Sequence, residues 1–209
     1  MKRNIAIAGI AALALAAGGT TVALAAGGDD EPSKAGAKSS VRVQDDDRRG
    51  TVLRDDDAAE NSAEVKAAEV SAADAISAAL KSASGTVVSA DLDDEDGGLV
   101  WDVDVLGKDG RTWHSVQVDP GTGKVLGSYV ERDDDEDDAR VAGLLKGASV
   151  SASDAVKAVS GKGTVTSVDV DDDSGVGAWD VETVSGAGAE SHWNVDVRSG
   201  KVTAGPLDD

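Results

Sequence analysis

The stretch that decides the fold is VSAADAI at residues 70–76, because a close copy of it, VSASDAV, returns at residues 150–156. In each copy a serine stands just before the apolar run and an aspartate follows three positions later, a pattern typical of a capped helix start. Apolar residues then recur at helical spacing, as at Ala72, Ala75 and Ile76. Each stretch therefore predicts the first turns of an amphipathic helix.

The repetition continues downstream of both helix starts. Gly-Thr-Val steps lie at 85–87 and 163–165, Trp-Asp-Val steps at 101–103 and 179–181, and Gly-Lys-Val turns at 123–125 and 200–202. The copies stay 78 to 80 residues apart through most of this span, and solenoid repeats are shorter, so the period indicates tandem domains. Apolar and polar residues alternate after each helix, as in an antiparallel sheet with one wet face. The sequence predicts an α+β fold of two tandem small modules, each a helix packed on a three- to four-stranded antiparallel sheet.

Two differences separate the copies. Copy one has Trp113-His114 where copy two has His192-Trp193. A displacement by one residue moves a side chain to the other face of a strand, so we expect either a bulge in copy one or an exposed Trp113. Copy two also closes with VRSGKV at 197–202, which we interpret as two residues shorter than the ending of copy one and as lacking its aspartate.

The N-terminus has the pattern of an export signal. Lys2 and Arg3 precede an apolar run at residues 5–17, and Ala23-Leu24-Ala25 fits the small-residue rule for cleavage after Ala25. An uncleaved membrane anchor is the alternative, although the run is short for a spanning helix. No other segment approaches transmembrane length.

Five segments follow from these patterns. Residues 1–25 form the signal peptide, 26–60 a disordered acidic tether, 61–132 the first module, 133–140 an acidic linker and 141–209 the second module. The tether and linker predictions rest on runs of Asp among sparse apolar residues, which bury too little surface to order a chain. The sequence leaves open whether the modules move independently or share an apolar face.

Charge and cysteine content exclude several classes of function. The chain has 20 Lys+Arg against 40 Asp+Glu, a formal net charge of -20. Such a charge repels nucleic acid and anionic membrane surfaces, whose binding needs Lys and Arg, and it attracts cations or basic partners. Because the chain has no cysteine, it forms no disulfide, thiolate metal site or cysteine nucleophile.

Acidic residues at alternating positions supply the one metal-site hypothesis. Asp91, Asp93 and Glu95 are hard oxygen ligands of the kind that suits Ca²⁺, but no EF-hand loop follows them. Solvated loops explain the acidic runs more simply. We therefore expect no cofactor and no dedicated metal site, and keep Ca²⁺ at these three residues as the alternative.

Trp113, His114 and Trp193 are the candidates for partner binding, because an exposed Trp is a frequent anchor in protein interfaces. A place in the core is the other interpretation of the Trp residues. The chain has neither a G-x-S-x-G elbow nor a phosphate-binding loop, so we expect no catalytic residues and no enzyme. A small hydrolase is the remaining hypothesis, and it requires His114 or His192 to face a carboxylate in a cleft.

The order of these motifs resembles that of the PepSY domain, the module named for peptidase propeptides and the sporulation protein YpeB. The resemblance rests on the two helix starts, on the strands WDVDV at 101–105 and WDVE at 179–182, and on the ending VQVDPGTGKVL at 116–126. It covers residues 65–132 and 145–209, about two-thirds of the chain.

The resemblance implies a secreted or envelope-associated, extracytoplasmic module without enzymatic activity. Modules of this family are proposed to inhibit or regulate peptidases in their surroundings, so the implied partner is an exported protein such as a peptidase. The family supplies no catalytic residues. An acidic Ca²⁺-binding envelope protein is the alternative function, and after signal cleavage we expect no membrane span.

Overall fold

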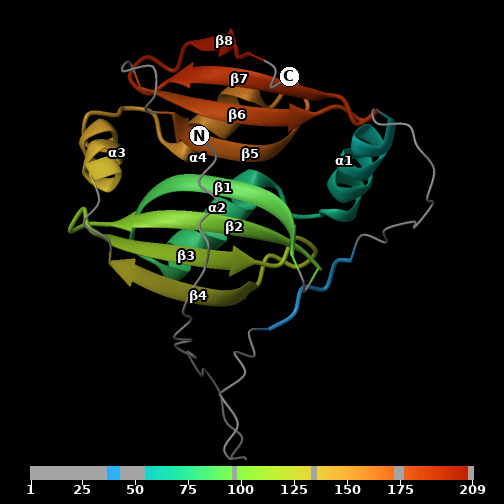
Figure 1. Ribbon diagram of the computed structural model, residues 1–209, viewed down its shortest axis with the longest axis horizontal. Helices are drawn as coiled ribbons and strands as arrows, with labels where there is room; N and C mark the ends of the chain where they lie inside the picture. Colours follow the sequence, from blue (N-terminus) through green and yellow to red (C-terminus); the bar gives the residue numbers. More distant parts are fainter. Residues whose placement is uncertain (1–36, 43–54, 96–97, 133–135, 172–176, 207–209) are drawn as a thin grey trace, which may run out of the picture.

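The computed structural model describes residues 37–42, 55–95, 98–132, 136–171 and 177–206. Its centre is one eight-stranded sheet in the order β4-β3-β2-β1-β5-β6-β7-β8, in which every neighbouring pair is antiparallel (Figure 1). The predicted signal peptide, residues 1–25, lies outside the described residues.

Each copy supplies two helices and four strands. Copy one contributes α1 (Asp55–Ala67), α2 (Ala72–Ser82), β1 (Gly85–Glu95), β2 (Gly98–Gly107), β3 (Thr112–Val118) and β4 (Val125–Arg132). Copy two contributes α3 (Glu136–Lys146), α4 (Ala152–Val159), β5 (Thr164–Asp171), β6 (Ala178–Val184), β7 (Glu190–Asp196) and β8 (Val202–Ala204). The predicted α+β fold of two tandem copies is confirmed.

The two repeated helix starts form as their sequences predict. Ser71 and Ser151 are N-caps that accept hydrogen bonds from the backbone of Asp74 and Asp154, and in copy two the full capping box is present. The apolar stripe of α2 packs on β1, β2 and β3, and that of α4 packs on β5, β6 and β7. The two helices also contact each other, so they cover the same face of the sheet. We call the opposite face the open face.

The fully buried Trp101 and Trp179 tie each helix start to its sheet. Their indole Nε1 atoms donate to the carbonyl oxygens of Val70 and Val150, at 3.0 and 2.9 Å. Both tryptophans therefore lie in the core, where a large ring with a bonded N–H contributes most in a chain so poor in aromatic residues.

The modules are joined through equivalent strands. β1 pairs antiparallel with β5, with Ser89 opposite Asp169, Ala90 opposite Val168 and Asp91 opposite Ser167. Because equivalent strands run antiparallel across this joint, the two copies are related by an approximate two-fold axis. A single hydrophobic cluster extends through both copies, so they share one core.

The tether and linker predictions need correction where the structure describes those residues. Within the predicted tether, residues 37–42 are held to copy one by hydrogen bonds, and α1 begins at Asp55. Within the predicted linker, α3 begins at Glu136. Local acidity misled the prediction because both helices are stabilised by packing on distant parts of the sheet, as the buried Val141 of α3 shows.

Both expectations for Trp113 are wrong. Trp113 and His114 pair regularly with Leu106 and Val105 of β2, so there is no bulge at Trp113, and Trp113 is only 8% exposed although it lies on the face opposite to Val116. It belongs with Leu106, Val141 and Leu145 to the hydrophobic cluster. The last two residues are in α3, which lies at that end of the open face and provides the cover (Figure 1).

The closing turn of copy two is complete, contrary to our interpretation of the sequence. In the sheet Val103 pairs with Val116 and its equivalent Val181 pairs with Trp193, which sets the copies 77 residues apart here. At this offset VDVRSGKV of copy two, residues 195–202, aligns with VDPGTGKV of copy one, residues 118–125, without a gap. The aspartate is present as Asp196, and the apparent exchange of Trp and His was an error of alignment.

Candidate functional site

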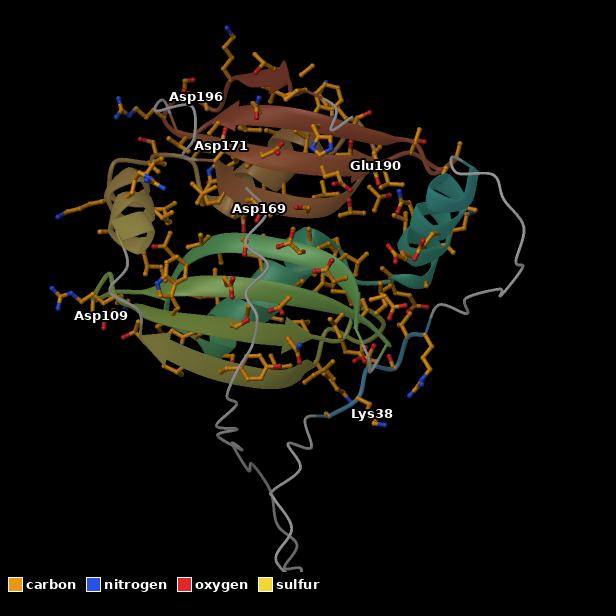
Figure 2. The ribbon with its side chains drawn as sticks, viewed as in Figure 1. Lys38, Asp109, Asp169, Asp171, Glu190 and Asp196 are labelled. Atoms are coloured by element: carbon orange, nitrogen blue, oxygen red, sulfur yellow. The ribbon has the colours of Figure 1, made fainter. Side chains whose placement is uncertain are left out.

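The open face of the sheet carries a row of carboxylates that meets at the joint between the modules. Figure 2 shows Asp169 at this joint, and Ser167 Oγ lies 2.7 Å from both Asp91 Oδ1 and Asp169 Oδ2. A hydroxyl has a single proton to donate, so both contacts are hydrogen bonds only if one carboxyl group is protonated. If both contacts are hydrogen bonds, one of the two aspartates therefore keeps a proton and donates it to Ser167 Oγ.

The surroundings of these carboxyl groups explain why a proton is retained. Burial and, next in size, the charge of Asp169 raise the pKa of Asp91 to about 8, although the hydrogen bond from Ser167 acts to lower it. Burial and the charge of Asp102 raise the pKa of Asp104 to about 6, and burial also raises the pKa of Asp102. The face thus favours protons or cations at neutral pH.

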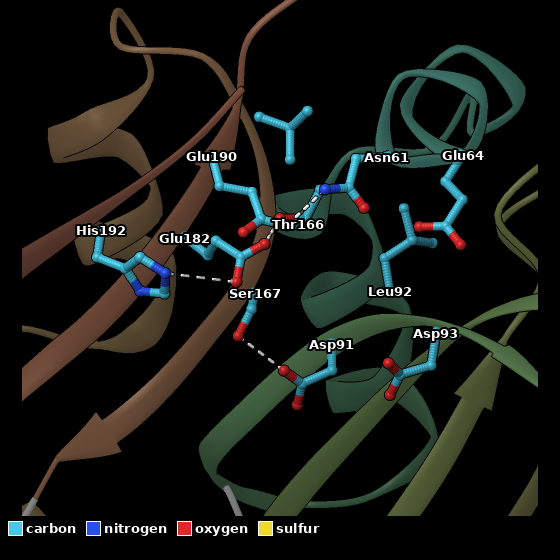
Figure 3. Close-up of a pocket in the computed structure, with 11 residues that line it drawn as sticks. Asn61, Glu64, Asp91, Leu92, Asp93, Thr166, Ser167, Glu182, Glu190 and His192 are labelled. Atoms are coloured by element: carbon cyan, nitrogen blue, oxygen red, sulfur yellow. Dashed lines mark hydrogen bonds and ion pairs between the residues drawn. The ribbon is translucent and has the colours of Figure 1, made fainter. Parts of the chain in front are cut away.

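A pocket of about 260 Å³ opens at the α1 end of this face (Figure 3). Helix α1 closes it from the copy-one side, because Asn61 Nδ2 donates to Glu190 Oε1 of β7. The backbone of α1 also comes so near the β6–β7 hairpin that a Cβ on Gly188 would overlap Ala58 O. Burial and the charge of Glu60 raise the pKa of Glu64, which lines this pocket, to about 7.

His192 lies in this pocket between two carboxylates. Its Nδ1 is 3.7 Å from Asp180 Oδ2 and its Nε2 is 3.9 Å from Glu182 Oε2, and its side chain is 9% exposed. Glu182 also accepts a hydrogen bond from Thr166 Oγ1 at 2.9 Å. His192 therefore meets the condition that we set for a hydrolase, a histidine facing a carboxylate in a cleft.

The predicted site residues are only partly brought together. Asp91 and Asp93 line the pocket, whereas the side chain of Glu95 lies outside the described ones. Among the described residues no group of three or more His, Asp or Glu has an arrangement that would hold a metal ion.

The three partner-binding candidates do not form one surface. Trp113 is buried under α3, and His114 lies on the helix-covered face opposite Val105. Trp193 is half-buried, donates from Nε1 to Thr183 Oγ1 at 2.9 Å, and has Lys162 Nζ 3.9 Å from its ring centroid. His192 entered the sequence predictions only through the hydrolase hypothesis and was not among the partner-binding candidates, since nothing near it in the sequence indicates the contribution of α1.

A second polar feature is the pair of closing turns, in which an aspartate accepts hydrogen bonds from the residues that follow it. Asp119 accepts from the backbone of Gly121 and Thr122, at 3.0 and 2.7 Å. Asp196 accepts from the backbone of Arg198 and Ser199, at 3.2 and 2.7 Å. The two turns have the same construction, in agreement with the corrected alignment.

In copy one this aspartate also holds the 37–42 segment, which is blue in Figure 1. Ser40 donates to Asp119 from its backbone N at 2.6 Å and from its Oγ at 2.7 Å, and Leu99 N donates to Val41 O at 3.1 Å. Asp119 is 2% exposed. Burial acts to raise its pKa, but the hydrogen bonds from Ser40 and Thr122 outweigh burial and lower it, so a charged aspartate anchors the segment.

Together, the fold and these turns define a duplicated helix-on-sheet module, and comparison with known proteins identifies it. The chain matches the PepSY family, described as peptidase propeptide and YPEB domain, at residues 69–129 and 149–204. These two regions make up more than half of the chain, which therefore belongs to the PepSY family.

Solved structures include a Clostridium difficile protein titled as a candidate lipoprotein. It is 22% identical, its alignment covers 65% of this chain and 91% of that chain, and the TM-score is 0.40. Comparison with curated proteins found no match. No helix within the described residues is long and apolar enough to cross a membrane.

Proposed function

We propose that this protein acts outside the cytoplasm as a non-catalytic module that binds an exported partner and restrains its activity, with a peptidase as the leading class of partner. The observation that carries the proposal is membership of the PepSY family in both copies. A signal-peptide pattern at residues 1–25 and a family that supplies no catalytic residues support it.

The joined sheet supports a binding role in physical terms. The two copies share one hydrophobic cluster, so the chain presents one continuous sheet of eight strands. The acidic open face and the -20 net charge favour a partner with a basic surface, because charge complementarity accelerates encounter and selects among partners.

The test uses the chain from residue 26 onward, immobilised and incubated with the exported proteins of its producer. We expect a captured peptidase, and slower cleavage of a protein substrate as the chain is added in excess. An immobilised acidic protein of similar net charge and unrelated fold is the control for charge alone. Unchanged proteolysis together with no capture beyond this control would contradict the proposal.

Cation binding is the second candidate function, and the meeting of Asp91 and Asp169 at Ser167, where burial and the charge of Asp169 raise the pKa of Asp91, favours it. Two carboxyl groups this close repel each other when both are ionised. A bound cation can relieve that repulsion in place of the proton. Calorimetry and thermal unfolding with millimolar Ca²⁺ at pH 8 test this. Saturable heat and a rise in melting temperature that are lost in Asp91→Asn would support it, and their absence in the unaltered chain would contradict it.

A further inference from the structure

The two closing turns are alike in construction, but the grooves beside them differ in content. In copy one the 37–42 segment fills the groove and bonds to Asp119, Leu99 and Leu126, the last through Ala37 N at 3.3 Å. By the alignment of the copies, the corresponding residues of copy two are Asp196, Gly177 and Thr203.

Those three corresponding residues line a hollow of about 320 Å³ among the described residues. We call it the copy-two groove, and its lining is completed chiefly by Ala178, Asn194 and Lys201. Figure 2 shows Lys38 and Asp196 at opposite corners of the molecule, as the two-fold relation requires. The 37–42 segment of the same chain therefore occupies one groove and lies far from the other.

We propose that the copy-two groove is a docking site for an extended segment of the exported partner, in which a residue with a side-chain hydroxyl donates to Asp196; this rests on the binding role proposed above. The hydrogen bonds that Asp196 accepts from described residues all end on Oδ1. On Asp119 it is Oδ2 that receives Ser40 N. The groove in copy two thus offers the same charged acceptor that holds a segment in copy one.

One difference between the copies, Gly121 in copy one and Arg198 in copy two, changes which segment fits the copy-two groove. A Cβ on Gly121 would lie 2.8 Å from Ser40 Oγ and 2.9 Å from Val41 Cγ2. Copy two has Arg198 at this position, so a bound segment must carry a residue smaller than valine there or lie farther from the turn. The difference explains how one chain keeps its own segment in copy one and leaves the other groove for a partner.

The experiment measures binding of a fluorescently labelled hexapeptide, Ala-Lys-Ser-Ser-Val-Arg of residues 37–42, to the exported chain by anisotropy. Salt of about 0.15 M and a scrambled peptide of the same composition control for attraction by net charge. We expect Arg198→Gly, which restores the glycine of copy one, to tighten binding of the hexapeptide by about threefold or more. Asp196→Asn should weaken it by about tenfold, since it removes a charge-assisted acceptor.

Asp109→Asn is the matched control. Like Asp196, Asp109 accepts hydrogen bonds from the backbone two and three residues later, at Arg111 and Thr112. It lies in the β2–β3 hairpin, away from the groove. We expect it to leave binding unchanged. Asparagine keeps a turn acceptor at either site, and thermal unfolding of each variant verifies the fold. Equal binding of the scrambled peptide, or no effect of Asp196→Asn and Arg198→Gly, would overturn the proposal.

Failure of this inference is distinguishable from failure of the binding role. If Asp196→Asn captures the exported partner as well as the unaltered chain does, the binding role stands and the groove is not its site. If the hexapeptide binds with the expected dependence on Asp196 and Arg198 but no partner is captured, the groove stands and the binding role fails.

Discussion

The two ends of the open face correspond to each other across the two-fold axis, yet they are built from opposite chemistry. At the α3 end Trp113 lies in the hydrophobic cluster with Val141. At the α1 end the corresponding residues are Glu190 and Asn61, which are joined by a hydrogen bond next to an acidic pocket. The two modules thus share one frame, but the contact at the α3 end, which we call the dry end, is apolar, whereas that at the α1 end, the wet end, is polar.

The comparison teaches that each module covers part of the other. Helix α1 of copy one packs against β6 of copy two, whereas α3 of copy two supplies Val141 and Leu145 to a cluster that includes Trp113 of copy one. The dry end contributes stability through burial. The wet end holds carboxyl groups with raised pKa values, so it is the end suited to a response to pH, cations or a partner.

The largest effect should come from breaking the dry end. We expect Trp113→Ala to lower the free energy of unfolding by about 3–5 kcal/mol, because it empties a large buried site. Chemical denaturation measures this. Glu190→Ala at the corresponding position of the wet end is the comparison, and an exposed side chain there should cost about 1 kcal/mol or less. Similar losses in the two variants would show that the ends do not differ in burial as described.

The second effect is a stability that falls as the pH rises. The pKa of Asp91 is about 8 in the folded chain against 3.8 for an ordinary aspartate. Between these values the folded state binds the additional proton, so the free energy of unfolding decreases with increasing pH. Asp91→Asn, neutral throughout, should therefore stabilise the chain at pH 8 by about 1–3 kcal/mol, an amount discounted for partial contact with solvent.

Thermal unfolding at pH 5 and pH 8 checks this prediction. For a chain of this size, 1–3 kcal/mol corresponds to a rise of about 2–12 °C at pH 8, and the rise should be much smaller at pH 5. Asp94→Asn removes the same charge from an exposed position of the same strand and is the control for net charge. An equal gain from Asp94→Asn would mean that the proton at Asp91 is not the cause.

The sequence predicted what local patterns determine. Caps at Ser71 and Ser151 define the helices, and alternation around Trp101 and Trp179 defines the strands that bury them. The joint was not predictable in this way, because Ser89–Asp91 has the same alternation as any strand with a wet face. The pocket at His192 depends on that joint and on α1, so no neighbouring residue reveals it.

The 37–42 segment was missed for a related reason. Its Ser-Ser-Val has no periodic pattern, and its anchor Asp119 is 79 residues from Ser40. The turn of copy two was misaligned because we matched its Trp and His to those of copy one, whereas the shared VD and GKV at 195–196 and 200–202 carry the correct alignment. Turn chemistry was the better guide, since each of its residues has a specific bonding role.

A smaller effect separates the two closing turns. Ser40→Ala removes the hydroxyl that donates to Asp119, and we expect a loss of about 1.5 kcal/mol, the low end for a hydrogen bond to a charged group, because Ser40 itself is exposed. We expect faster hydrogen exchange at the Leu99 amide, which donates to Val41 O, and a lower free energy of unfolding. Ser199→Ala, which removes the hydroxyl that bonds Asp196, should cost less because that turn is exposed. Equal costs would contradict the difference in burial.

The smallest effect tests the wet end itself. Asn61→Ala removes the donor to Glu190, and we expect a loss of about 0.5–1 kcal/mol that is similar at pH 4 and pH 8. Asn61→Asp instead places a second carboxylate beside Glu190 and near Glu64, so its cost should be larger at pH 8 and smaller at pH 4, where ordinary carboxyl groups are partly protonated. Denaturation of both variants at the two pH values separates lost bonding from repulsion. If the two substitutions gave the same loss at pH 8, α1 would be held at this end by something other than the bond to Glu190, and the contrast with the dry end would lie in packing alone.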